Sequence, residues 1–148
     1  MIAVIQRVSR SSVTVNNAVV GQIDKGLNVL LGVGQGDSIS DAKYLAKKIS
    51  DLRIFEDNNK KMNLSVKDIG AEILIISQFT LLADCKKGNR PSFTNAEQPD
   101  TAKKLYEDFI SLVNDQGIKT QEGIFGADMK VEIINDGPVT IIIDSNKK

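Results

Sequence analysis

The sequence predicts a single α+β domain over residues 1–148, with a mostly antiparallel, barrel-like sheet and two main helices. Three observations support this prediction. Apolar residues alternate with other residues in the first third of the chain, as in half-buried strands. Two later segments space their apolar residues three and four apart, as amphipathic helices do. No internal repeat, low-complexity tract or linker divides the chain.

The first third of the chain is predicted to form strands joined by tight turns. Alternation over residues 2–15 indicates strand structure, and the two asparagines at 16–17 supply a turn. A further strand is expected over residues 18–23, followed by a turn at 24–26. Residues 27–33 are mostly apolar and lie between two glycines, which is typical of a strand buried on both faces.

Two helices are predicted where the spacing of apolar residues changes from two to three and four. The first is predicted over residues 40–53, with Ser40 or Asp41 as its N-cap, and the second runs from its N-cap Asp100 to Gly117. Each should pack one apolar face on the sheet. The apolar residues are Ala42, Leu45, Ala46, Ile49 and Leu52 in the first helix, and Ala102, Leu105, Phe109, Leu112 and Val113 in the second.

The remaining segments complete the predicted fold. Residues 62–70 have no clear period and are expected to form a connecting loop. Residues 71–77 form the most hydrophobic strand of the second half, and residues 84–99, rich in Lys, Gly, Asn and Pro, should be irregular. A closing hairpin is predicted from residues 130–134 and 139–144.

Composition excludes several kinds of chemistry. The chain has no histidine, so it cannot form a Ser-His-Asp triad, a Cys-His dyad or a histidine-bound catalytic zinc site. A single cysteine, Cys85, cannot form an internal disulfide. No apolar run approaches the ~20 residues that span a bilayer, and no signal segment is evident, so a cytoplasmic location is expected. We expect neither a cofactor nor a metal.

Charge gives no general indication of a nucleic-acid partner. The formal net charge is zero, so any contact with RNA must come from local clusters such as Lys86 and Lys87 with Arg90. Residues 90–93, Arg-Pro-Ser-Phe, have two interpretations: they can bind phosphate and stack a base, or form an ordinary solvated loop. The glycine-rich residues 32–36 lack the spacing of a dinucleotide-binding loop.

Two short stretches are the main candidates for chemistry. Residues 77–81, Ser-Gln-Phe-Thr-Leu, follow a buried strand, although their polar groups can equally hydrogen-bond to nearby backbone. Thr80 is a doubtful nucleophile because no base adjoins it in the sequence. Gly137-Pro138 fits a structural turn. In the cis form, the pair can also aim successive carbonyls in one direction, as acceptors for an ammonium group.

A third candidate is the pair Phe125 and Met129. By default they belong to the core, but an adenine-sized ring can also lie between a phenyl ring and a thioether. The sequence alone leaves both interpretations open.

Together these segments resemble the D-aminoacyl-tRNA deacylases, the D-tyrosyl-tRNA deacylase family, which hydrolyse D-amino acids from mischarged tRNA. The resemblance covers essentially the whole chain, and several ordered motifs are more specific than any one of them. Cys85 stands where the family more often has threonine or another small residue. The matching segments are residues 1–8, 62–65, 77–81, 87–88, 90–93, 125–129 and 135–140.

The resemblance implies a homodimer with a shared site. Gly137 and Pro138 of one subunit are expected to reach into the pocket of the other. Arg7 matches a position that braces the Gly-Pro loop. Phe125 and Met129 match positions that hold the terminal adenine of tRNA. The residues expected at the catalytic centre are Ser77, Gln78, Phe79 and Thr80.

The resemblance also implies a mechanism and a role in translation quality control. The 2′-hydroxyl of the terminal ribose is expected to assist ester cleavage, while the protein supplies orientation and backbone donors. The Gly-cis-Pro backbone should exclude L-aminoacyl esters but accept glycine mischarged on alanine tRNA. Two alternatives remain: a non-enzymatic dimer that binds aminoacyl-tRNA or a D-amino acid, and a structural α+β module.

Overall fold

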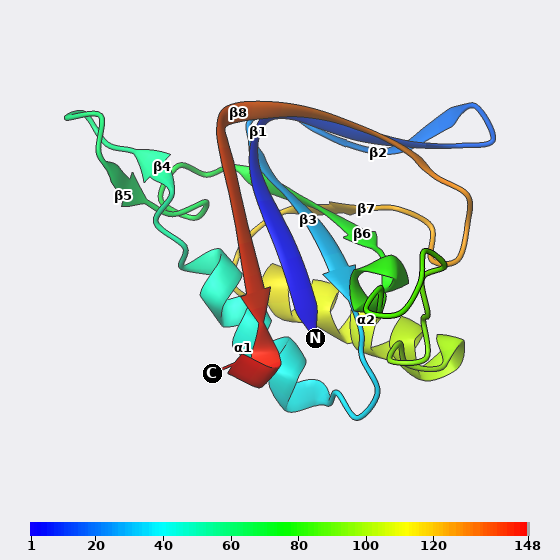
Figure 1. Cartoon of the computed structure of the whole chain (residues 1–148). Helices are drawn as coiled ribbons and strands as arrows, with labels where there is room; N and C mark the ends of the chain where they lie inside the picture. The colour runs from blue at the N-terminus through cyan, green and yellow to red at the C-terminus, as the bar shows by residue number, and fades with distance from the viewer. Residues whose placement is uncertain (148) are drawn as a thin grey trace.

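The computed structural model describes residues 1–147 and confirms the α+β fold, with a mostly antiparallel, curved sheet and two main helices (Figure 1). The main sheet has the strand order β2-β1-β3-β6-β7, and β8 pairs with β1. Its outermost strands approach each other, since a Cβ on Gly21 of β2 would lie 2.6 Å from the carbonyl oxygen of Glu122 in β7. The strands are β1 (Ile2–Val15), β2 (Ala18–Ile23), β3 (Gly26–Gly32), β6 (Glu72–Ser77), β7 (Thr120–Glu122) and β8 (Lys130–Asp144).

Strand β1 pairs with three neighbours. Its first half lies antiparallel to β3, its second half antiparallel to β2, and β8 runs antiparallel to it on the other side. The predicted turn between β1 and β2 is present, with Asn16 and Asn17 both at positive φ. Strand β6 is parallel to β3, and β7 is parallel to β6. The predicted strands of the first third are therefore confirmed.

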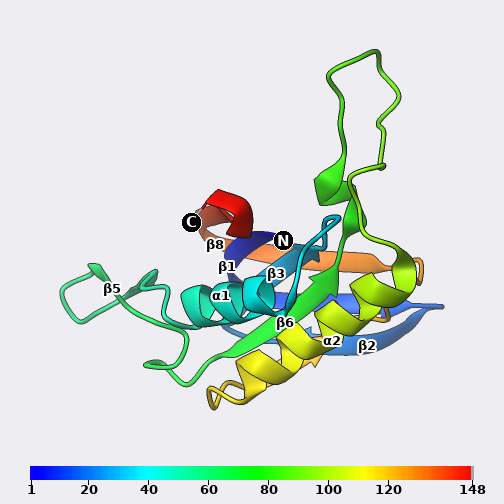
Figure 2. The ribbon, with the colours of Figure 1, turned by 90° about the horizontal axis from the view of Figure 1, so that it is seen from below.

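The two helices, α1 (Ile39–Ser50) and α2 (Pro99–Asn114), lie on the same face of the sheet (Figure 2). Their predicted apolar faces are confirmed: Leu45 and Phe109 are fully buried in one core cluster with Ile5 of β1. Among residues 1–147, neither helix nor any other is long and apolar enough to cross a membrane.

The predicted helix boundaries need correction. Helix α1 begins after Ser38, whose N–H donates to a carboxylate oxygen of Asp41 at 2.9 Å, so Ser40 and Asp41 are not its N-cap. Helix α2 begins at Pro99, and Asp100 lies inside its first turn rather than at the cap. Proline suits the first helical position because its missing N–H would have had no partner there.

The predicted hairpin near the C-terminus is wrong. Strand β8 is continuous and pairs with β1 on both sides of its middle, and Figure 1 shows how sharply it bends. Gln6 pairs with Thr140 and Val8 with Asn135, so the single β1 residue Arg7 lies opposite residues 136–139 of β8. These residues form a bulge that resembles a hairpin turn in sequence. We call residues 136–139 the β8 bulge.

Three further short strands were not predicted. Part of the expected loop at residues 62–70 is a strand, β5 (Met62–Leu64), which pairs with β4 (Phe55–Glu56). Strand β7 was also missed, because three residues are too few to show a period.

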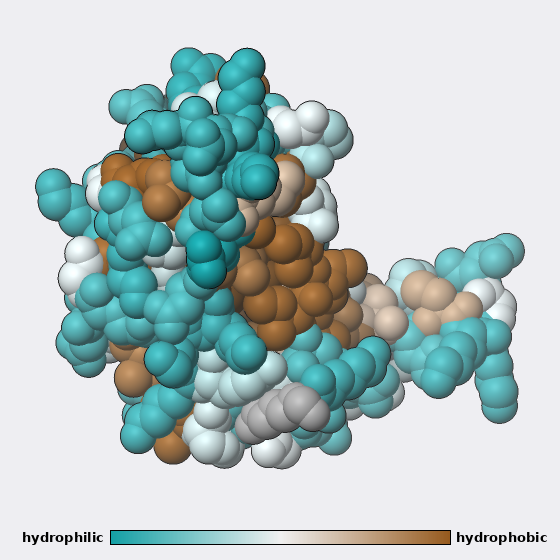
Figure 3. Space-filling model, turned by 90° about the vertical axis from the view of Figure 1, so that its left-hand side faces the viewer, coloured by the Kyte–Doolittle hydropathy of each residue, from teal (hydrophilic) through white to brown (hydrophobic). Residues whose placement is uncertain are grey.

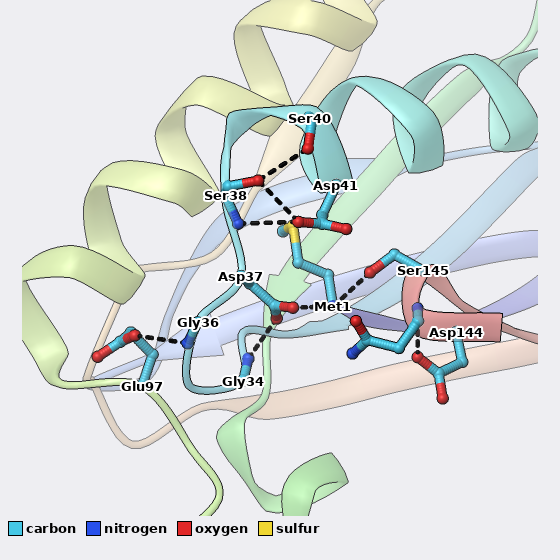
Figure 4. Close-up of polar contacts among 11 residues, drawn as sticks. Met1, Gly34, Gly36, Asp37, Ser38, Ser40, Asp41, Glu97, Asp144 and Ser145 are labelled. Atoms are coloured by element: carbon cyan, nitrogen blue, oxygen red, sulfur yellow. Dashed lines mark hydrogen bonds and ion pairs between the residues drawn. The ribbon is translucent and has the colours of Figure 1, made fainter. Parts of the chain in front are cut away.

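The loop between β3 and α1 is anchored at the start of the chain (Figure 4). The Met1 ammonium lies 2.6 Å from Oδ1 of Asp37 and donates to Oγ of Ser145 at 2.6 Å. The other carboxylate oxygen of Asp37 accepts a hydrogen bond from the Gly34 N–H at 2.6 Å. Gly34 in turn bridges to Ala96, just before α2. Asp37 therefore connects the start of β1 with the segment that leads into α2.

We predict that Asp37→Asn lowers the free energy of unfolding by about 3 kcal/mol, because it leaves the buried Met1 ammonium without a counter-charge. Urea denaturation measures the change. The matched control is Asp24→Asn at an exposed turn, which should change stability by less than about 0.5 kcal/mol. Equal effects of the two variants would show that Asp37 makes no special contribution.

Candidate active site

A pocket of about 510 Å³ opens between the end of β6, the start of α2 and the segment before β8. Its size is typical of small-molecule sites, and most of its walls are apolar. The fold here assembles residues from distant parts of the chain. Of the candidate site residues singled out in the sequence, those lining the pocket are Ser77, Gln78, Phe79, Thr80, Phe93, Phe125 and Met129.

The end of β6 places the first group of these residues. Ser77 pairs with Leu31 in the parallel ladder, and the Gln78 N–H donates to the Leu31 carbonyl at 2.8 Å. The chain then turns into a short 3₁₀ helix, η1 (Phe79–Leu82). A Cβ on Gly32 would lie 2.5 Å from the Leu82 side chain, so glycine at the end of β3 is what allows η1 to approach.

The side-chain contact within this segment does not activate the Thr80 hydroxyl as a nucleophile. Nε2 of Gln78 donates a hydrogen bond to Oγ1 of Thr80 at 3.1 Å. Because Gln78 acts as a donor in this contact, it does not accept the proton of the Thr80 hydroxyl as a general base would. The N–H groups of Phe79 and Thr80 begin the 3₁₀ helix, where backbone donors lack intrahelical partners. They are available to a carbonyl oxygen of a ligand. Among residues 1–147, no cluster of three acidic or cysteine side chains is arranged to hold a metal.

Phe125 and Met129 line the pocket from another segment. A turn closed by the Ala127 N–H and the Ile124 carbonyl, 3.1 Å apart, presents Phe125. Its ring packs against Tyr106 of α2, with ring centroids 5.9 Å apart. The Tyr106 hydroxyl donates to the Ile75 carbonyl at 2.8 Å, and burial raises the pKa of this phenol above its ordinary value. Tyr106 therefore remains a neutral donor that ties α2 to β6 behind the pocket.

Tyr106 and the start of α2 were missed as part of the site. Tyr106 extends the apolar face of its helix, and nothing in the local pattern distinguishes it from a core residue. Glu97, Gln98 and Pro99 also line the pocket, but only the long-range packing of α2 brings them there.

Two exposed aromatic rings lie at the pocket. Phe79 and Phe93 make an edge-to-face contact with centroids 5.1 Å apart, yet their exposed fractions are 58% and 38%. Phe93 lies within the segment, residues 84–99, that was predicted to be irregular. Exposed rings that already contact each other offer a preformed surface for a flat ligand group.

Arg7, Gly137 and Pro138 lie outside this pocket. The Arg7 guanidinium is buried and donates from Nε to the Asp136 carbonyl at 3.0 Å and from Nη1 to the Ile54 carbonyl at 2.7 Å. It thus holds the β8 bulge from behind. Gly137 and Pro138, joined by a cis peptide bond, are exposed at the surface. Within one chain, the structure does not bring the bulge and the pocket together.

Comparison with known proteins identifies the family. A family model described as D-Tyr-tRNA(Tyr) deacylase matches residues 4–144. The chain belongs to this deacylase family. It is 56% identical over 147 residues to a D-aminoacyl-tRNA deacylase of Clostridium perfringens and 58% identical to one of Desulforamulus reducens, and each alignment covers 99% of both chains. The resemblance seen in the sequence motifs is confirmed.

Solved structures show the same architecture. One titled "c-Myc DNA Unwinding Element Binding Protein" has a TM-score of 0.91 and 40% identity, covering 97% of this chain and 98% of that one. Another, of a probable eukaryotic D-amino acid tRNA deacylase, has a TM-score of 0.81 at 17% identity and covers 96% and 97% of the two chains. The second likeness concerns the fold alone and extends the deacylase fold to a distant sequence.

Proposed function

We propose that the chain hydrolyses the ester bond of D-aminoacyl-tRNA, releasing the free amino acid and tRNA as a step of translation quality control in the cytoplasm. Family membership supports the reaction. The observation that supports a location for it is the meeting of the Ser77–Thr80 segment with Phe125 and Met129 in one pocket. An apolar wall suits the terminal adenine, and adjacent backbone donors suit the ester.

In the proposed mechanism, backbone groups replace the usual side-chain catalysts. The N–H groups of Phe79 and Thr80 stabilise the negative charge that develops on the ester carbonyl oxygen. Water adds to the carbonyl carbon, the bond to the ribose 3′-oxygen breaks, and that oxygen receives a proton. The neighbouring 2′-hydroxyl of the substrate assists this proton transfer. Thr80 has no role as a nucleophile, because its hydroxyl accepts a hydrogen bond from Gln78 and contacts no base.

We predict that Thr80→Ala retains measurable activity on D-tyrosyl-tRNA, whereas a substrate ending in 2′-deoxyadenosine loses at least about 100-fold in kcat, or ~2.7 kcal/mol. Single-turnover release of labelled tyrosine measures both. The deoxy substrate should still inhibit competitively, which separates binding from chemistry. Loss of all activity in Thr80→Ala, with normal cleavage of the deoxy substrate, would make Thr80 the nucleophile.

The second part of the proposal is a homodimer in which the β8 bulge completes the partner's pocket. Gly137 and Pro138 of the bulge are exposed, and they lie outside the pocket of their own chain. Strand β8 also exposes Ile134 and Ile142, with exposed fractions of 43% and 68%. Figure 3 shows a continuous hydrophobic area on one side of the molecule. A two-fold interface would cover such surface and complete two sites at once.

Co-expression of two inactive variants tests the shared site. Gly137→Val distorts the bulge, since even a Cβ there lies 2.8 Å from the Val139 side chain, and Thr80→Arg fills the pocket. If bulge and pocket act across the interface, half of the dimers are mixed and each has one intact site. We predict about a quarter of wild-type activity. No recovery in purified mixed dimers would place both elements in one subunit.

The third part of the proposal concerns chirality. The carbonyls of the bulge are proposed to face the α-amino group of the substrate, so that an L side chain meets fixed backbone while a D side chain or glycine does not. Arg7 supports this role because it is buried and holds the bulge through the Asp136 carbonyl, while a second donor of its guanidinium is fixed on the Ile54 carbonyl. A thousandfold exclusion requires only ~4 kcal/mol, which such a clash can supply.

We therefore predict that wild-type protein cleaves D-tyrosyl-tRNA and glycyl-tRNA but spares L-alanyl-tRNA, and that Arg7→Gln reduces the D over L preference at least tenfold. The matched control is Arg10→Gln, on the same strand, which removes only an exposed ion pair to Glu132. Initial rates on the three esters measure the preference. Equal protection of glycyl and L-alanyl esters, or an unchanged preference in Arg7→Gln, would be incompatible with exclusion by the bulge.

A binding protein without hydrolytic activity is the alternative. The 40% identical neighbour is titled a DNA-element binding protein, which shows that a related chain has been described by binding alone. Incubation with D-tyrosyl-tRNA distinguishes the two. Amino acid released faster than in a protein-free control supports the hydrolase, whereas protection of the ester without release supports the binder.

A further inference from the structure

A narrow segment projects from the body of the protein beside the pocket (Figure 2). Its base is closed by Asp84 and Ser92, which exchange two backbone hydrogen bonds of 2.8 and 2.9 Å. We call residues 84–92 the basic projection. The whole of it beyond Asp84 is exposed. Figure 3 shows it as a largely hydrophilic extension at the edge of a hydrophobic area.

The basic projection carries an excess of positive charge in a chain whose formal net charge is zero. Its cations are Lys86, Lys87 and Arg90, all exposed, and its one acidic residue is Asp84 at the base. Oδ1 of Asp84 accepts the backbone N–H of Lys86 at 2.9 Å. The one carboxylate of the segment is therefore engaged by a backbone N–H at the base of the projection.

Other basic residues of the chain behave differently. Lys47 and Lys104, for example, form ion pairs with carboxylates one helical turn away. Within residues 1–147, none of the ion pairs involves a cation of the basic projection. Three unpaired cations on one segment repel one another, and a polyanion would relieve this repulsion.

The position of the basic projection indicates which polyanion. Ser92 at its base is followed directly by Phe93, whose exposed ring contacts Phe79 at the pocket. A groove or extension of positive charge next to exposed aromatic rings is the combination by which proteins bind single-stranded nucleic acid. An acidic protein partner would explain the charge but not its place beside a nucleotide-sized pocket.

We propose that the basic projection binds the phosphate backbone of the single-stranded 3′ end of an RNA, next to the terminal nucleotide in the pocket. This inference rests on the proposed function, since the terminal nucleotide is the one that carries the ester. Lys86, Lys87 and Arg90 supply affinity for phosphate without reading the sequence, and the pocket supplies the chemistry.

The test compares two substrates in the variant Lys86→Gln/Lys87→Gln/Arg90→Gln. The KM for D-tyrosyl-tRNA should rise at least about tenfold, and the dependence of log(kcat/KM) on log salt should become less steep by about 2, as expected when three contacts to single-stranded phosphates are lost. Cleavage of the minimal ester D-tyrosyl-adenosine should stay within about twofold of wild type. That second rate also shows that the variant is folded.

A control variant separates position from net charge. Lys43→Gln/Lys47→Gln/Lys48→Gln removes the same charge from the exposed side of α1 and should leave the KM for tRNA unchanged. An unchanged KM and salt slope in the projection variant, or an equal change in the α1 variant, would overturn the proposal.

Direct binding makes the test independent of catalysis. Fluorescence anisotropy with uncharged tRNA, and with a short single-stranded RNA, should show at least tenfold weaker binding by the projection variant than by the α1 variant, whatever the RNA sequence. If wild-type protein cleaves neither ester, the proposed function fails, and this comparison still decides whether the basic projection binds RNA. Equal affinities of the two variants would reject it.

Discussion

The pairing of β1 with three other strands is the constraint on which both parts of the site depend. Through β3, β1 is connected to β6, whose end places Ser77 at the pocket. On its other side, β1 is paired with β8, whose register shifts opposite Arg7. A slip of one residue in either pairing would turn every side chain of that strand to the opposite face. The positions of pocket and bulge are therefore set by one strand.

Arg7 links the pairing of β1 with β8 to the position of the bulge. It is the β1 residue that faces the bulge, and its buried guanidinium uses two donors on carbonyls of separate segments. Burying a guanidinium is costly unless its hydrogen bonds are made. The bulge and the segment before β4 supply those acceptors, so the same contacts that satisfy Arg7 also hold the bulge in place. An exposed loop thereby gains a buried support.

Much of the fold could be predicted because the signals are local. Alternation along β1, the asparagine turn and the apolar faces of α1 and α2 all lie within short windows, and the structure confirms them. The hairpin at residues 130–144 was mispredicted for a physical reason. Gly-Pro satisfies the local requirements of a turn, and only the long-range pairing of both halves with β1 distinguishes a bulge from a hairpin.

The candidate site could be predicted only in part, because some of its contacts are long-range and have no local signal in the sequence. Ser77 to Thr80 stood out because polar residues follow an apolar strand, and the motif resemblance singled out Phe125 and Met129. The role of Tyr106 behind the pocket could not be predicted from the sequence. It depends on long-range contacts with a carbonyl of β6 and with the ring of Phe125. The separation of the bulge from the pocket of its own chain results from the arrangement of strands in the sheet. Neither the motif at residues 77–81 nor the one at residues 135–140 indicates it by itself.

The proposed site uses backbone groups, apolar side chains and charged side chains for different tasks, and substitutions affect these three kinds of group differently. Backbone donors at η1 cannot be removed by substituting a side chain, and preorganised dipoles need no reorganisation as charge develops. The apolar wall depends on Phe125, which Tyr106 supports through a neutral, buried hydroxyl. The backbone donors and the two rings carry no formal charge, whereas Lys86, Lys87 and Arg90 of the basic projection lie outside the pocket. The proposed binding of a polyanion by the projection is therefore separable from the proposed chemistry in the pocket.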